Sequence, residues 1–197
     1  AIKGRALALD ITAADAAQTL VQAAQADGGW QGVVHNAGIT RDKTIARMPA
    51  HLWQNLVNVN LAAQLQINRA LLQAQALKPH ARLVCVSSIS GIAGNVGQTN
   101  YAYSKAGVIG LVQAQAPVLP RGMAINAVAP GWMEGEWMER MLKDKYDDLM
   151  GRRAKLTPLK RCVTADDVAE TMLSLIRGNR FVTGEVIVID GGFTSST

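Results

Sequence analysis

The feature that most constrains the fold is an alternation of short apolar runs with helical segments along most of the chain. Each run is rich in Val, Ile, Leu or Ala and is followed by a stretch of helix-compatible residues. The predicted strands are residues 6–9, 31–35, 82–86, 123–128 and 181–189. The predicted helices cover residues 12–26, 49–77, 102–114, 132–156 and 166–176, the last capped by Thr164. Nearly continuous apolar strands separated by helices favour an α/β fold with a parallel sheet covered on both faces.

Polar residues or chain breaks follow four of the predicted strands. They are Asp10, Asn36, Ser88 and Pro130. Ligands of parallel sheets gather at the carboxyl ends of the strands, so we expect a binding site there.

The segment from Ser87 to Lys105 carries a candidate redox site. Its glycine-spaced middle is typical of a loop between a strand and a helix. On that helix Tyr101 and Lys105 are four positions apart, which puts a phenol and an ammonium on one face. We expect the positive charge to lower the pKa of the phenol from its usual value near 10, and Ser88 to hold the substrate oxygen. Such groups suit a carbonyl that accepts hydride and then a proton.

Length, composition and net charge limit the classes of protein to which this chain can belong. At 197 residues and 49% hydrophobic content, the chain fits one globular domain. It has no apolar stretch near the roughly 20 residues that cross a bilayer and no signal-peptide pattern, so we expect a cytoplasmic protein without membrane contact. A net charge of +5 favours anionic ligands such as a phosphate-bearing cofactor or an acidic carrier protein. Without a basic run interleaved with aromatics, nucleic-acid binding is not expected.

The cysteines and histidines do not form a metal-binding pattern. Cys85 and Cys162 belong to no C-x-x-C or Cys/His cluster, and the histidines are scattered. We therefore expect free thiols and no metal.

Several residues of the candidate redox segment match a known family. Ser88, the glycines at 91, 94 and 97, Asn100, Tyr101 and Lys105 together resemble the active-site segment of the short-chain dehydrogenase/reductase family. The resemblance extends over essentially the whole chain, including N-A-G at Asn36, Ala37 and Gly38, and Asn60 in N-V-N-L. It implies a Rossmann-like doubly wound sheet and an NAD(P)-dependent oxidoreductase acting on CH–OH groups.

The resemblance also implies roles for a catalytic tetrad. Tyr101 is expected to be the general acid in reduction, and Lys105 to lower its pKa and bind the nicotinamide ribose. Ser88 is expected to orient the substrate carbonyl, and Asn60 to help hold a proton-relay water.

Cofactor-binding residues follow from the same resemblance. Asp10, with Ile11 beside it, is expected near the adenine, and the N-A-G segment next to the cofactor. Pro130, Gly131 and Met133 resemble the segment along the nicotinamide, although Trp132–Glu136 replaces the threonine that often contacts the carboxamide.

The chain departs from the family at its beginning. It resembles a single domain over residues 1–197 that is N-terminally incomplete, because the first β-α-β unit with its glycine-rich pyrophosphate turn has no counterpart. The residue that separates NAD(H) from NADP(H) would lie in that unit. We expect either cofactor, with a lean to NADP(H).

The substrate is narrowed by a further resemblance. N-A-G-I-T-R-D at 36–42 followed by Lys43 is similar to 3-oxoacyl-[acyl-carrier-protein] reductases and acetoacetyl-CoA reductases of fatty acid biosynthesis and lipid metabolism. It implies an acyl thioester substrate on an acyl-carrier protein or CoA. The Trp- and Met-rich segment 132–161 fits an apolar acyl group or ordinary core packing equally well. Arg82 and Arg121 are candidates to face the carrier or the CoA phosphate.

Other possibilities remain open at this point. The substrate can instead be a sugar, a steroid or a small alcohol, or the protein can be a non-catalytic binding or assembly subunit. Family resemblance further implies a homodimer or homotetramer, with residues 52–77, 101–116 and 181–189 as interfaces.

Overall fold

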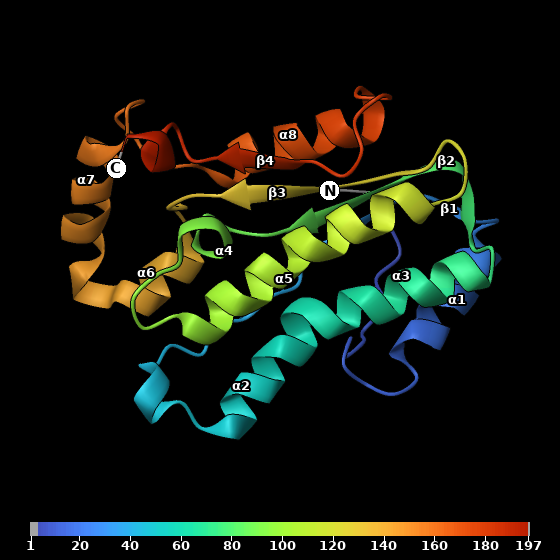
Figure 1. Cartoon of the computed structure of the whole chain (residues 1–197), viewed down its shortest axis with the longest axis horizontal. Coiled ribbons are helices and arrows are strands. Elements are labelled where there is room, and N and C mark those ends of the chain that lie inside the picture. The colour runs from blue at the N-terminus through green and yellow to red at the C-terminus, as the bar shows by residue number, and fades with distance from the viewer. Residues whose placement is uncertain (1–3, 197) are drawn as a thin grey trace.

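The computed structural model describes residues 4–196 and arranges them as a parallel sheet between helices on both faces (Figure 1). The strands lie in the order β1-β2-β3-β4, and every neighbouring pair is parallel. Their bounds are Trp30–His35 (β1), Leu77–Val86 (β2), Ala124–Pro130 (β3) and Val186–Ile189 (β4). The predicted α/β fold is therefore confirmed.

The helices divide between the two faces and one end of the sheet. Helices α1, α3 and α5 lie on one face, α8 lies on the other, and α6 and α7 lie beyond the carboxyl ends of the strands (Figure 1). A π-helical turn, Asn58–Ala62, joins α2 to α3. The bounds are Ala16–Ala26 (α1), Ala50–Val57 (α2), Ala63–Gln73 (α3), Ser90–Ala93 (α4), Thr99–Gln115 (α5), Glu136–Leu142 (α6), Tyr146–Leu156 (α7) and Ala165–Arg177 (α8).

The core forms because successive residues of the central strands point to opposite faces of the sheet. Leu83 and Cys85 of β2 pack into the cluster shared with α1, α3 and α5. Val84 of the same strand packs with Val168 and Leu175 of α8 in a second cluster. Burial on both faces explains why these strands are apolar throughout.

Helix α8 begins where the sequence predicts. The Thr164 hydroxyl accepts the N–H of Asp167, and the Asp167 carboxylate accepts the Thr164 N–H, which completes a capping box.

The strand predicted at residues 6–9 is wrong, because these residues lie outside the sheet. A strand requires a neighbour for its backbone groups. Among the described residues the sheet contains β1 to β4, and residues 6–9 pair with none of these strands.

The predicted 49–77 helix is also too long. It ends at Gln73, and the predicted helix breaker Pro79 instead lies inside β2. Pro79 is tolerated because the pairing register jumps from Trp30↔Leu77 to Gly32↔Arg82, so the residues between them bulge out of the ladder.

Two further predicted elements are shortened or divided. The segment predicted as one helix over 132–156 forms α6 and α7, separated by the 3₁₀ turn Lys143–Lys145. The strand predicted over 181–189 begins at Val186, because Gly184 adopts φ +80° just before it. Within the described residues, no helix is long and apolar enough to cross a membrane.

Candidate active site

A cavity of about 470 Å³ opens at the carboxyl ends of β2 and β3. Three predicted groups line it: Ser88 after β2, Tyr101 on α5, and the Pro130–Met133 segment after β3. Residues of α6 and α7 close the other side. The structure therefore places most of the predicted catalytic and nicotinamide residues around one space.

The Ser88 loop and the Pro130 segment are tied together by backbone hydrogen bonds. The Ser87 N–H donates to the Val128 carbonyl at 2.7 Å, and the Ile89 N–H donates to the Pro130 carbonyl at 3.1 Å. The Ser88 hydroxyl oxygen accepts the Ser90 N–H at 3.1 Å, which orients its side chain. Because of these bonds, the two walls of the cavity hold a defined separation.

Tyr101 lies in the first turn of α5, and Lys105 lies one turn further along the same face. The Lys105 Nζ is 5.6 Å from the centroid of the Tyr101 ring, as the four-residue spacing predicts. Nζ donates to the Val86 carbonyl at 2.7 Å, and the residue is buried. The Lys105 ammonium therefore lies near the Tyr101 ring and is bound to the last residue of β2.

The expected lowering of the pKa of Tyr101 by Lys105 is wrong for this structure. Burial raises the pKa of Tyr101 above its ordinary value, a hydrogen bond from Ser88 opposes that rise, and the Asp42 carboxylate adds to it. Burial also lowers the pKa of Lys105 to about 8. The reason is desolvation, because both side chains lose water that would stabilise their charged forms.

Asn60 is fully buried in the π-helical turn, and its side chain binds protein groups. Its Oδ1 accepts the Ile39 N–H at 2.9 Å, and its Nδ2 donates to the Ile39 carbonyl at 3.0 Å and to the Ser104 hydroxyl at 3.1 Å. Both amide hydrogens are therefore used to fix the segment after β1 against α5. The Asn60 backbone carbonyl accepts the Gln64 side-chain amide at 2.8 Å, and the role of Asn60 with a water stays a prediction.

Gly38 lies where this segment meets Asn60 and Lys105. A Cβ atom at this glycine would lie 3.5 Å from the Asn60 Oδ1 and 3.6 Å from the Lys105 Nζ. The N-A-G segment therefore passes directly beside the predicted tetrad.

The structure adds two residues that sequence reasoning did not single out, Asp42 and Gln98. The Gln98 Nε2 donates to the Asp42 Oδ2 at 2.8 Å, and both line the cavity. The contact joins the segment after β1 to the turn before α5. Fifty-six positions separate the two residues, and Asp42 entered the sequence analysis only as the last residue of N-A-G-I-T-R-D.

The segment that is predicted to lie along the nicotinamide is held at the end of the sheet. The Gly131 N–H donates to the Ile189 carbonyl at 2.9 Å, and Met133 pairs with Val163 in an isolated bridge. A Cβ atom at Gly131 would lie only 2.7 Å from the Asp190 Cβ, so the backbone passes unusually close to that residue. Pro130, Gly131 and Met133 line the same cavity as Tyr101.

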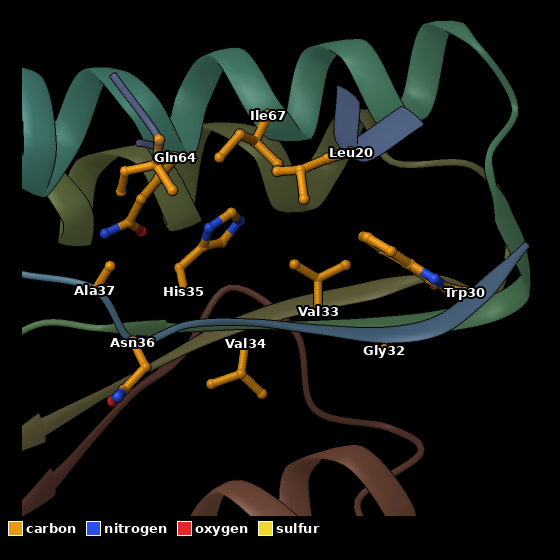
Figure 2. Close-up of a pocket in the computed structure, with 11 residues that line it drawn as sticks. Leu20, Trp30, Gly32, Val33, Val34, His35, Asn36, Ala37, Gln64 and Ile67 are labelled. Carbon is orange, nitrogen blue, oxygen red and sulfur yellow. The ribbon is translucent and has the colours of Figure 1, made fainter. Parts of the chain in front are cut away.

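Three of the remaining cofactor candidates lie at a second cavity of about 420 Å³ along β1. Ile11, Asn36 and Ala37 line it with Gln64 of α3. Figure 2 shows His35 and Ala37 pointing toward α3, whereas Asn36 points to the opposite side of the strand. Predicted cofactor residues therefore line two separate cavities, and Gly38 and Lys105 are in the lining of neither.

Asp10 lines neither cavity and is exposed. Its carboxylate accepts the N–H and the hydroxyl of Thr12, at 2.9 and 2.7 Å, which lowers its pKa. In this structure the Asp10 carboxylate therefore stabilises the turn that contains Thr12.

Residues of the Trp- and Met-rich segment both line the cavity and pack in a core cluster. Trp132, Trp137 and Met141 line the cavity, while Met138 lines it and is also buried against Met150. Trp and Met side chains therefore supply an apolar part of the cavity lining.

Arg82 does not face a partner. It is 9% exposed and donates to the carbonyls of His80, Ala81 and Gly122, so its predicted docking role is wrong. The guanidinium satisfies backbone carbonyls at the bulge in β2.

Cys85 and Cys162 are free and buried, and burial raises the pKa of Cys85 to about 12. Across residues 4–196, no group of three or more His, Cys, Asp or Glu side chains could hold a metal ion.

Comparison with known proteins connects this arrangement to a family. A family model described as enoyl-(acyl carrier protein) reductase matches residues 1–194. The 3-oxoacyl-[acyl-carrier-protein] reductase FabG of Thermotoga maritima is 37% identical over 187 residues, which are 93% of this chain and 74% of that protein. FabG of Escherichia coli is 34% identical over 192 residues, 96% of this chain and 77% of that protein.

A solved structure agrees with the sequence relatives. A short-chain dehydrogenase/reductase of Brucella melitensis, described as glucose/ribitol dehydrogenase, matches with a TM-score of 0.87 and 28% identity, over 94% of this chain and 74% of that one. The chain therefore belongs to the short-chain dehydrogenase/reductase family and is an NAD(P)-dependent oxidoreductase that acts on CH–OH groups.

Proposed function

We propose that the protein reduces a 3-oxoacyl thioester to the 3-hydroxyacyl form. The observation that carries this proposal is the cavity that Ser88 and Tyr101 line together with a wall of Trp and Met side chains. Such a wall suits an acyl chain and disfavours a sugar. Two of the relatives are named as 3-oxoacyl-[acyl-carrier-protein] reductases, which supports the same substrate class and a place in fatty acid biosynthesis.

The side chains have complementary tasks in this reaction. Pro130, Gly131 and Met133 would hold the nicotinamide, which would supply a hydride for the carbonyl carbon. The Ser88 hydroxyl donates to the carbonyl oxygen and orients it. Tyr101 then gives its proton to that oxygen, and its raised pKa keeps the phenol protonated at neutral pH.

We further propose NADP(H) as the preferred cofactor, an acyl-carrier protein or CoA as the carrier, and a cytoplasmic homodimer or homotetramer. The net charge of +5 supports anionic cofactors and carriers in general. Lys105, at the end of β2 behind Tyr101, is the residue proposed to bind the nicotinamide ribose.

The test is consumption of NADPH, and separately of NADH, by the full-length protein with acetoacetyl-CoA. We expect Tyr101→Phe to lower kcat by about 10²- to 10⁴-fold, because it removes the proton donor. Tyr103→Phe is the matched control, since Tyr103 is 55% exposed two positions along α5, and it should leave kcat unchanged.

Two results would contradict the proposal. One is equal turnover by the wild type and Tyr101→Phe. The other is turnover of a sugar, steroid or simple alcohol with no turnover of the thioester, which would keep the chemistry and change the substrate. A folded full-length protein that neither binds nor oxidises the cofactor would support the non-catalytic alternative.

A further inference from the structure

Arg153 of α7 places a positive charge in the wall of the cavity that holds Ser88 and Tyr101. Its guanidinium carbon lies 4.4 Å from the centroid of the Trp132 ring and 5.8 Å from that of Phe193. Aromatic rings stabilise a cation through their faces. The two rings thus hold the guanidinium in place without using its N–H groups.

The N–H groups of Arg153 lack acceptors within the described part of the chain. Its Nε is buried and has no hydrogen-bond partner there. The ion pairs formed by residues 4–196 include the neighbouring Arg152 with Asp148, and Arg161 with Asp167, but none formed by Arg153. A buried N–H without an acceptor is costly, so the arrangement favours a ligand that supplies one.

Two carboxylates near the cavity are already engaged. Asp42, which lines the same cavity, accepts from Gln98. Asp190, close to Phe193 in the chain, accepts the N–H of Gly192 and both the N–H and the hydroxyl of Thr194. The free donors of Arg153 are therefore available to a bound molecule.

We propose that Arg153 determines substrate specificity by binding an oxyanion of the substrate, either a carboxylate or a phosphate. The planar guanidinium matches both groups through paired N–H donors. The cavity would then select negatively charged 3-oxo compounds over neutral ones. This inference rests on the proposed reduction and names the charge that its substrate carries.

The experiment compares three substrates of the full-length protein with the preferred cofactor. Acetoacetate carries a carboxylate, acetoacetyl-CoA carries phosphates, and the N-acetylcysteamine thioester of acetoacetate carries neither. We expect Arg153→Gln to lower kcat/KM for one anionic substrate by about tenfold to a hundredfold, and for the neutral thioester by less than about twofold. The anionic substrate that suffers the loss identifies the oxyanion as a carboxylate or a phosphate.

Two variants serve as controls. Arg152→Gln removes the same charge from the adjacent position of α7, where the side chain is 64% exposed, and should alter none of the three values. Arg153→Lys keeps the charge without the planar donors, so its kcat/KM for the affected substrate should lie between those of the wild type and Arg153→Gln. Melting temperatures show whether each variant is folded.

Equal losses for all three substrates, or no loss for any, would overturn the role of Arg153 while leaving the reductase intact. If the wild type reduces none of them, the proposed function fails, and ligand binding then decides about Arg153. Trp132 fluorescence, assigned with Trp132→Phe, should respond to an anionic compound in the wild type and not in Arg153→Gln. An identical response in both proteins, or none in the wild type, would overturn the inference.

Discussion

At the scale of single residues, burial controls the acid–base properties of the candidate site. Tyr101 and Lys105 are adjacent on α5, yet desolvation raises the pKa of one and lowers that of the other. A protonated phenol suits the reducing direction, in which the tyrosine donates. The two groups therefore favour proton delivery at neutral pH.

Lys105 makes the stability of the fold depend on pH in a defined direction. Its pKa falls from 10.5 to about 8 on folding, so between these values the unfolded chain binds a proton that the folded chain does not. Stability contributed by this group must rise with pH across that window. We expect the free energy of urea unfolding of the wild type, minus that of Lys105→Met, to increase from about pH 7.5 to about pH 10. A difference that is constant or decreases would show that Lys105 is not desolvated.

At the scale of elements, the site depends on a close approach of α4 to α5. A Cβ atom at Gly91 would lie 2.7 Å from the Lys105 carbonyl carbon and 2.8 Å from the Ala106 backbone nitrogen. Only a residue without a side chain permits this contact. The glycine thus sets the position of Lys105 relative to the loop that carries Ser88.

We expect Gly91→Ala to lower the free energy of unfolding by about 1–3 kcal/mol, because backbone atoms must move apart. Gly110→Ala is a matched control on α5, since nothing lies within 4 Å of its added Cβ. It should raise stability by about 0.5–1 kcal/mol through helix propensity. Urea unfolding measures both, and equal effects of the two substitutions would rule out the close contact.

At the scale of the whole molecule, exposed apolar side chains occur on the segments proposed as interfaces. Leu65 of α3 and Tyr103 of α5 are 46% and 55% exposed, and Phe181, just before β4, is fully exposed. Burying such side chains between copies of the chain removes apolar surface from water. These positions support the proposed homodimer or homotetramer.

Light scattering should therefore give a mass of two or four chains, and Phe181→Glu should reduce it, because a charge would be buried at the interface. Ile45→Glu introduces the same charge at a site that is 61% exposed and outside the three segments, and it should leave the mass unchanged. A monomeric wild type would contradict the proposal.

Local pattern and family resemblance together predict much of the candidate site. The spacing of Tyr101 and Lys105 predicts one helix face, and the residues after the apolar runs predict the end of the sheet where Ser88 and Pro130 lie. The N-A-G segment and Asn60 are predicted from family resemblance, and the structure places them together. Their catalytic roles stay predictions.

The alternation of strands and helices follows from the sequence alone, because periodic burial and helix capping act over a few neighbouring residues. The position of residues 6–9 outside the sheet follows only from the tertiary arrangement, because a strand depends on a distant partner. The pKa of Tyr101 also depends on the tertiary structure, because burial raises it. The contact of Arg153 with the rings of Trp132 and Phe193 likewise follows only from the tertiary arrangement. These outcomes depend on contacts between segments far apart in the chain, which no local pattern encodes.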